Sequence, residues 1–127
     1  MNPIHAEHAP QAIGPYSHAI RSGKLLFCSG QTPLDPVTMK LSGETIEEQT
    51  TAALTNLSRV LESAGLSLAD VVKTTVFLKD MDDFTGMNAA YAAVFGEHKP
   101  ARTTISVRAN PLDALVEIEC MAEFPDG

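Results

Sequence analysis

The sequence predicts an α/β fold of the α+β type, in which two helices cover one face of a single mixed β-sheet. Two segments, 46–64 and 84–95, carry apolar residues at helical spacing, and five short runs have the alternation or the β-branched content of strands. Their order is strand, strand, helix, strand, helix, strand, strand. Because both helices would lie on one face, the other face needs a cover, and an oligomer is expected.

The first two strands are expected at 16–21 and 25–29, because Ser22-Gly23-Lys24 between them is typical of a hairpin turn. The segment up to Ile13 has little periodicity and is expected to form an arm on the surface. After the second strand, the run 30–36 is rich in turn-forming residues and indicates a loop.

The first helix has a marked start and a marked end. Thr45 and Glu48 have the spacing of a capping box, and Gly65 is typical of the residue that follows a helix. Its apolar stripe consists of Ile46, Ala53, Leu54, Leu57, Val60, Leu61 and Ala64. This stripe predicts a helix that packs against the sheet.

A central strand and a second helix follow. Residues 71–78 form a nearly continuous β-rich run, which suits a central strand. Asp82 or Asp83 can cap the second helix, which is expected to end at Gly96. The apolar stripe of this helix consists of Phe84, Met87, Tyr91, Val94 and Phe95.

The last two strands show a period of two. In 103–108, the residues at 103, 105 and 107 share one face, and Arg102 belongs by parity with the polar set on the other. In 116–124, apolar residues alternate with Glu117, Glu119, Met121 and Glu123. The last strand is therefore expected to pack one face on the core and to present a mostly acidic face on the other side.

The composition of the 127 residues, 44% hydrophobic and 20% charged, is that of a single globular domain spanning 1–127. No run approaches the roughly 20 apolar residues that cross a bilayer, and the start lacks the features of a signal peptide, so no membrane partner and a cytoplasmic location are expected. Cys28 and Cys120 fall inside strand patterns, which favours reduced buried thiols. The net charge of −7 argues against a nucleic acid partner, because no basic patch offsets it.

Two residues of the last strands are candidates for chemistry. Arg102 follows Pro100-Ala101 at the start of a strand, where its planar guanidinium could bind a ligand carboxylate. Glu117 comes fifteen residues later and could hold a water, if a cation such as Arg102 or Arg108 keeps it ionised. The alternatives are a surface arginine that snorkels from a strand end and a solvated acidic face.

Four further positions are candidates for ligand contact. In a hairpin, Tyr16 and Ser29 lie close together, and Gly30 indicates a close approach to the backbone. Asn88 interrupts an apolar helical stripe, so its amide must bond something specific in a core, an interface or a site. The alternatives are a half-buried aromatic ring at Tyr16 and a hydroxyl at Ser29 that bonds its own backbone.

The histidines do not have the spacing of a metal site. His5 and His8 lie in the unpatterned arm, and His18 and His98 have no companions at ligand spacing. The sequence also lacks a glycine-rich phosphate loop. No metal and no cofactor are expected.

A series of short motifs resembles the RidA/YjgF family, which also carries the label L-PSP endoribonuclease. The motifs are Ala12-Ile13-Gly14-Pro15-Tyr16-Ser17, Ser29-Gly30-Gln31, Ala64-Gly65-Leu66, the run 70–78, Asp83-Phe84, Asn88-x-x-Tyr91, Pro100-Ala101-Arg102 and Val116-Glu117-Ile118-Glu119. They match the family in order and spacing from the arm to Glu119, which is essentially the whole chain.

The resemblance implies a chorismate-mutase-like fold in which three subunits bring their sheets together as a barrel, with clefts between neighbours. It also implies a cofactor-free enamine/imine deaminase, which hydrolyses 2-aminoacrylate, through its imine, to pyruvate and ammonia. By position, Arg102 would bind the carboxylate of the 2-imino acid and Glu117 would orient the attacking water. Tyr16, Ser29 and Gly30 would contribute to the cleft, Asn88 would come from the neighbouring chain, and Thr104 would present its backbone N–H.

Two departures from the family pattern bear on substrate preference. Many relatives have cysteine where Thr104 stands, and the loop at Glu97-His98-Lys99 is short. The alternative functions are an endoribonuclease, a non-catalytic trimer that binds 2-keto acids, and a deaminase of a larger enamine. The acidic charge and the lack of a basic groove oppose the endoribonuclease.

Overall fold

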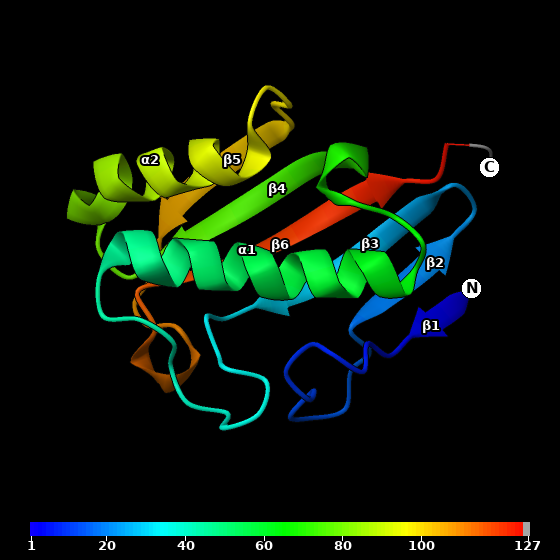
Figure 1. Ribbon diagram of the computed structural model, residues 1–127, viewed down its shortest axis with the longest axis horizontal. Helices are drawn as coiled ribbons and strands as arrows, with labels where there is room; N and C mark the ends of the chain where they lie inside the picture. The colour runs from blue at the N-terminus through cyan, green and yellow to red at the C-terminus, as the bar shows by residue number, and fades with distance from the viewer. Residues whose placement is uncertain (126–127) are drawn as a thin grey trace.

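The computed structural model describes residues 1–125 and contains one six-stranded sheet in the order β1-β2-β3-β6-β4-β5. The strands are β1 (Asn2–Ile4), β2 (Ala19–Ser22), β3 (Leu25–Gln31), β4 (Val71–Leu78), β5 (Ala101–Ser106) and β6 (Val116–Glu123). Neighbouring strands are antiparallel, except that β4 and β5 are parallel. Both helices, α1 (Ile46–Ser63) and α2 (Phe84–Phe95), lie on the same face of the sheet, as predicted (Figure 1).

The N-terminal arm is more than the surface segment expected from its sequence. Its first residues form β1, which pairs with β2 at the edge of the sheet. The buried His18 side chain then holds the arm, because Nδ1 accepts a hydrogen bond from the Ala6 N–H (2.8 Å) and Nε2 donates one to the Pro10 carbonyl (2.8 Å). Both partners are backbone groups, so no side-chain pattern in the arm signals this contact.

The predicted hairpin is present, but its first strand is shorter than expected. β2 begins at Ala19 and not at Tyr16, whose N–H donates to the Gly14 carbonyl (3.0 Å) within a turn. Gly23 occupies the hairpin turn with a φ of +62°, a conformation that glycine adopts without steric cost. β3 continues to Gln31, and its pairing with β6 becomes irregular between Cys28 and Gln31.

The expected capping box begins α1. Thr45 Oγ1 accepts a hydrogen bond from the Glu48 N–H (3.1 Å), and the Glu48 carboxylate accepts one from the Thr45 N–H (3.1 Å). Hydrogen bonds from the Glu44 and Thr45 N–H groups lower the pKa of Glu48 and keep it ionised beside the positive end of the helix. Gly65, with a φ of +79°, follows the helix as predicted.

The second helix begins at Phe84, directly after one of the two aspartates expected to cap it. Asp83 occupies the cap position, but its side chain makes no capping hydrogen bond. Asp80 instead accepts a hydrogen bond from the Asp82 N–H (2.8 Å) and caps the short 3₁₀ turn before the helix. Burial, together with the charges of Asp80 and Asp82, raises the pKa of Asp83.

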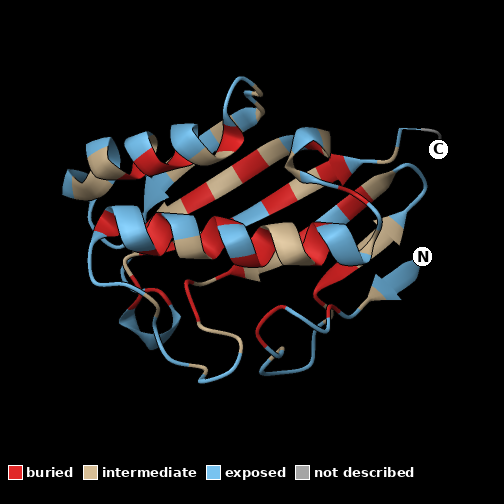
Figure 2. Cartoon of the chain, in the orientation of Figure 1, coloured by how far each residue is buried: buried red, intermediate tan, exposed pale blue. Residues whose placement is uncertain are grey.

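The core lies between the sheet and the two helices (Figure 2). The apolar residues of β6 point into it with the predicted alternation, and the acidic ones point away. Cys28 and Cys120 face each other across β3 and β6 as buried free thiols, which confirms the expected burial. Their contact and their burial raise the pKa of the Cys120 thiol far above its usual range.

The opposite face of the sheet is open. No helix within residues 1–125 covers it (Figure 1), and Phe27 and Ile105 remain 44% and 42% exposed. Neither helix in this part of the chain is both long and apolar enough to span a bilayer.

Candidate functional site

Arg102 lies on the helix side of the edge strand β5, next to α2. Its guanidinium carbon is 4.9 Å from the centre of the Tyr91 ring and 5.7 Å from that of Phe84, and one of its nitrogens is 3.9 Å from the Met87 sulfur. Aromatic faces and a thioether hold a cation without saturating its strong donors. Within residues 1–125 no carboxylate forms an ion pair with Arg102. The guanidinium is therefore held in place with donors available to an anion.

Tyr91 supports the guanidinium from inside the core. Its hydroxyl shares a hydrogen bond of 2.7 Å with the buried hydroxyl of Thr74, and its ring lies 4.7 Å from that of Phe95. Burial raises the pKa of Tyr91, so the phenol is neutral under the arginine. A hydrogen bond therefore holds the hydroxyl of Tyr91, and packing on Phe95 holds its ring.

Asn88, Tyr91 and Arg102 line one cavity of about 450 Å³, which we call the arginine half-site. Asn88 Oδ1 is buried there and has no hydrogen-bond partner in the described chain. Thr104 lies on the same face of β5 as Arg102, and its Oγ1 is also buried without a partner among residues 1–125. An orphaned acceptor and a set of free donors are what a polar ligand would satisfy.

A second cavity of about 640 Å³, which we call the glutamate half-site, lies between the arm and the ends of β3 and β6. Tyr16, Ser29, Gly30 and Glu117 all line it, so the structure brings these four predicted residues together. The Ser29 hydroxyl does not bond its own backbone: it donates to the Ser17 carbonyl (2.7 Å). That bond ties the end of β3 to the loop that carries Tyr16.

Gly30 is a glycine because the Glu117 side chain lies against it. A Cβ atom added at Gly30 would overlap Glu117 Oε1 and would lie 2.9 Å from Cδ and 3.1 Å from Cγ. The predicted close approach to the Gly30 backbone is thus made by the Glu117 carboxylate itself. The lack of a side chain at Gly30 leaves the space that this carboxylate occupies.

The cation expected beside Glu117 is not supplied by Arg102 of the same chain. Across β4, Arg102 is registered with Thr74 on the helix face, whereas Glu117 is registered with Phe77 on the open face. The two candidate residues therefore lie on opposite sides of the sheet. Burial, together with the nearby charge of Glu119, raises the pKa of Glu117, which is opposite to the effect of a cation.

A loop that the sequence did not single out forms one wall of the glutamate half-site. It precedes β6 and contains the 3₁₀ turn Pro111–Asp113, and Pro111 and Leu112 line the cavity. Leu112 and Asp113 have φ values of +56° and +58°, in the left-handed region that costs a non-glycine residue about 1–2 kcal/mol. The only sequence signal is the Asn110-Pro111 pair, which is typical of a turn.

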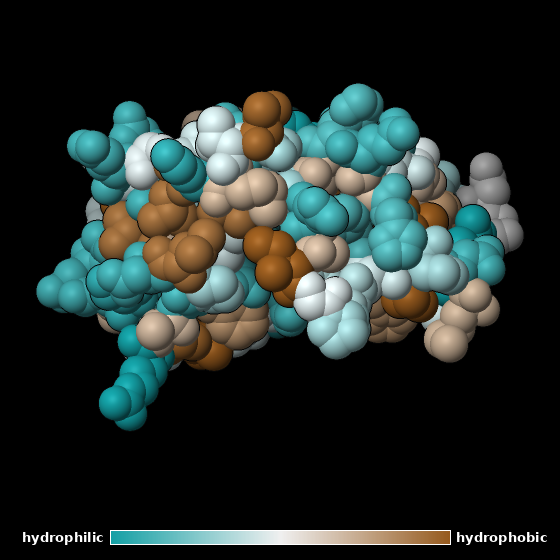
Figure 3. Space-filling view, turned by 90° about the horizontal axis from the view of Figure 1, so that it is seen from below, coloured by the Kyte–Doolittle hydropathy of each residue, from teal (hydrophilic) through white to brown (hydrophobic). Residues whose placement is uncertain are grey.

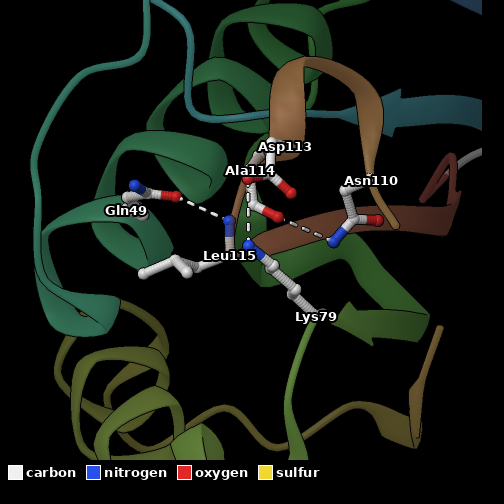
Figure 4. A network of polar contacts seen from close by, with 6 residues as sticks. All are labelled: Gln49, Lys79, Asn110, Asp113, Ala114 and Leu115. Carbon is white, nitrogen blue, oxygen red and sulfur yellow. Dashed lines mark hydrogen bonds and ion pairs between the residues drawn. The ribbon is translucent and has the colours of Figure 1, made fainter. Parts of the chain in front are cut away.

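Polar contacts hold this loop from three sides (Figure 4). The buried Asn110 side chain donates to the carbonyls of Phe77 (3.1 Å) and Ala114 (3.2 Å). The Leu115 N–H donates to the Gln49 side chain of α1 (2.8 Å). Lys79 forms an ion pair with Asp113 (3.0 Å), and its N–H donates to the Leu115 carbonyl. The strained backbone is thus held by the structure around it.

The loops at the lower edge of Figure 1 carry exposed apolar groups. Ile13 of the arm and Leu112 of the 3₁₀ turn are 72% and 59% exposed, and both line the glutamate half-site. The same edge, seen from below in Figure 3, shows hydrophobic groups set among hydrophilic ones. Within residues 1–125, His, Cys, Asp and Glu do not gather in a group of three or more that could hold a metal ion.

The structure is that of a small α+β protein with one mixed sheet, and its candidate site residues are divided between the two faces of that sheet. The chain belongs to the family described as endoribonuclease L-PSP, which it matches over residues 6–124. This finding confirms the resemblance drawn from the sequence motifs.

Similar proteins include deaminases by name. A RutC family protein of Pyrococcus horikoshii is 51% identical over 94% of each chain. A protein of Salmonella typhimurium named 2-iminobutanoate/2-iminopropanoate deaminase is 43% identical, again over 94% of each. The crystal structure of Escherichia coli TdcF with bound serine has a TM-score of 0.91 and 36% identity, covering 97% of this chain and 98% of that one.

Proposed function

We propose that this protein is an imine deaminase, a hydrolase that converts small 2-imino acids to 2-keto acids and ammonia. The observation that carries the proposal is the pair of half-sites. One holds an anchored guanidinium that has no ion-pair partner among residues 1–125, and the other holds a carboxylate whose pKa is raised by burial. A 2-imino acid needs both groups, an anion anchor for its carboxylate and a base for the water that attacks its C=N bond. The name of the Salmonella relative supports the same reaction.

The two half-sites would meet between subunits of a trimer. Arg102 and Glu117 lie on opposite faces of the sheet, so one chain cannot place both against one small substrate. A closed ring of three copies could bring the arginine half-site of one subunit to the glutamate half-site of the next. The exposed Phe27 and Ile105 on the open face give such a ring an apolar surface to bury.

In the proposed mechanism, the substrate carboxylate binds the Arg102 guanidinium, and the Thr104 backbone N–H adds a second contact at the edge of the sheet. Glu117 accepts a proton from water as the oxygen bonds to the imine carbon. Glu117 then returns this proton to the nitrogen, which gives a neutral tetrahedral carbinolamine. The hydroxyl proton passes to the nitrogen as the C–N bond breaks, and the 2-keto acid and ammonia leave. Tyr16, Ser29, Gly30 and Asn88 would complete the cleft around the substrate.

Mixing two inactive variants tests this assignment. Arg102→Ala and Glu117→Ala are each expected to lose accelerated imine hydrolysis in an assay that couples a pyridoxal-phosphate dehydratase to pyruvate detection. When they are unfolded together and refolded as mixed trimers, about a quarter of the clefts would combine an intact Arg102 with an intact Glu117 from different subunits. Activity near a quarter of the wild-type value supports the shared site. No recovery, although mixed trimers form, would refute it.

A second candidate function is RNA cleavage, because the family description names an endoribonuclease. Two acids, Glu117 and Glu119, line the larger cavity, and the net charge is −7, so a polyanion would be repelled. RNA cleavage that persists through purification and disappears in Arg102→Ala would favour this function over the deaminase.

A further inference from the structure

We propose that Leu112 determines substrate specificity, and that the wall it forms favours longer aliphatic side chains of the 2-imino acid over anionic ones. This inference rests on the proposed deaminase function and adds the substrate class to it. The Leu112 side chain lies outside the core, and its backbone is strained.

The conformation of Leu112 is unusual for its residue type. Its φ and ψ of 56° and 23° are left-handed, a region that asparagine and glycine adopt more readily than leucine. Leu112 is 59% exposed, so burial in the core does not explain the choice of leucine. A strained apolar residue at the wall of a cavity is better explained by contact with a ligand.

Leu112 shares its cavity with other exposed side chains that offer apolar surface. Ile13 and Tyr16 of the arm line the same cavity and are 72% and 47% exposed. Glu117 and Glu119 supply the negative charge of the cavity. A substrate side chain that reaches this wall gains by being apolar and loses by being anionic.

The wall is fixed in place. Asn110, Lys79 and Gln49 hold the loop through the contacts shown in Figure 4, each with a donor–acceptor distance of 3.2 Å or less. A wall held in this way cannot move aside for a bulkier group. The wall therefore discriminates between substrate side chains by their length and polarity. Each methylene that it buries should raise kcat/KM roughly fourfold.

The test uses a series of imines that differ by one methylene. An amino acid oxidase generates them in place from alanine, 2-aminobutyrate, norvaline and norleucine, with aspartate as the anionic member, and semicarbazide traps the imine that remains. For the wild type, kcat/KM should rise roughly fourfold per methylene until the wall is covered, and the aspartate-derived imine should be the poorest substrate.

Two substitutions at Leu112 and one control isolate the side chain. Leu112→Gly removes it and keeps a backbone that tolerates the left-handed region, and Leu112→Asn keeps a side chain of similar length but makes it polar. Met39→Gly relieves the same kind of strain, φ +59°, at a position outside the cavity lining. In both Leu112 variants, the ratio of kcat/KM between the norleucine-derived and the alanine-derived imine should be about tenfold smaller than in the wild type. Met39→Gly should reproduce the wild-type ratio.

Each outcome supports or refutes the role of Leu112. A wild-type series without chain-length preference, or Leu112 variants that keep the wild-type series while folded by circular dichroism, would overturn the role of Leu112 and leave the deaminase function standing. Equal flattening by Met39→Gly would show that strain relief, and not the side chain, is responsible. A wild type that accelerates the decay of no imine in the series would refute the proposed function, and the inference with it.

Discussion

Replacing Gly30 by alanine should lower activity about a hundredfold and leave the fold intact. The new Cβ atom would overlap Glu117 Oε1, and the atoms in its way belong to a flexible side chain and not to the backbone. The carboxylate would therefore swing aside. Gly30 does not have a positive φ, so alanine adds no backbone strain.

The expected magnitudes follow from these contacts. Alanine in a compatible conformation stabilises a protein by about 0.4–1 kcal/mol through the unfolded chain. Moving Glu117 from its rotamer costs about 0.5–1.5 kcal/mol. The two terms nearly cancel, so thermal unfolding should shift by only a few degrees. Displacing a catalytic group by an ångström or more lowers the rate about a hundredfold.

A double-mutant cycle provides the assay and its control. Imine hydrolysis is measured for Gly30→Ala, Glu117→Ala and the double variant, alongside thermal unfolding of each. If Gly30 acts by positioning Glu117, the alanine at position 30 has no further effect once Glu117 is gone. The reasoning is refuted if Gly30→Ala keeps wild-type activity, or if it costs a hundredfold in both backgrounds.

Three further predictions concern the two half-sites. Activity should fall as pH drops through the raised pKa of Glu117. Glu119→Gln should move this fall in the pH–activity profile to lower pH, because the charge of Glu119 is one of the two causes that raise the Glu117 pKa. A fall at the same pH in both proteins would contradict this. The folded pKa of Glu117 lies above its ordinary value of 4.5, so its contribution to stability is present below pH 4.5 and is lost as pH rises through the folded pKa. Glu117→Gln should therefore raise the melting temperature relative to wild type at neutral pH but not at pH 4, and an equal difference at both would refute the linkage. Tyr91→Phe should lower the free energy of unfolding in denaturant by about 1–3 kcal/mol, because buried Thr74 loses its hydrogen-bond partner, but it should leave KM unchanged. Tyr91→Leu should raise KM, because Arg102 loses the aromatic face that holds it. The same KM for both variants would show that the ring does not position the guanidinium.

The regular elements could be predicted because their causes are local in the sequence. Thr45 and Glu48 form their capping box within one helical turn, and Gly65 follows the helix without help from the rest of the chain. The alternation in β6 likewise reports directly which side chains face the core. These signals do not depend on the strand order, so the predictions drawn from them hold although β1 in the arm was not predicted.

The features that sequence reasoning missed depend on contacts between distant segments. His18 binds backbone groups of the arm, and Leu112 takes its strained conformation from a loop held by Gln49 of α1. The alternation of residues placed Arg102 on the polar face of its strand, but it did not show that this face lies toward the helices. That follows only from the register of β5 on β4, where Arg102 lies beside the buried Thr74.

The separation of Arg102 from Glu117 has a chemical consequence of its own. If the two side chains met within one chain, they would form an ion pair, the Glu117 pKa would fall, and the guanidinium would lose the donors that a substrate carboxylate needs. The sheet between them prevents this pairing: Arg102 rests on aromatic rings, and Glu117 is half-buried beside another acid. In a cleft shared by two subunits, the carboxylate of the bound 2-imino acid would neutralise the arginine before it could lower the basicity of the glutamate. The bound substrate would thus prevent an ion pair between Arg102 and Glu117 of the two subunits.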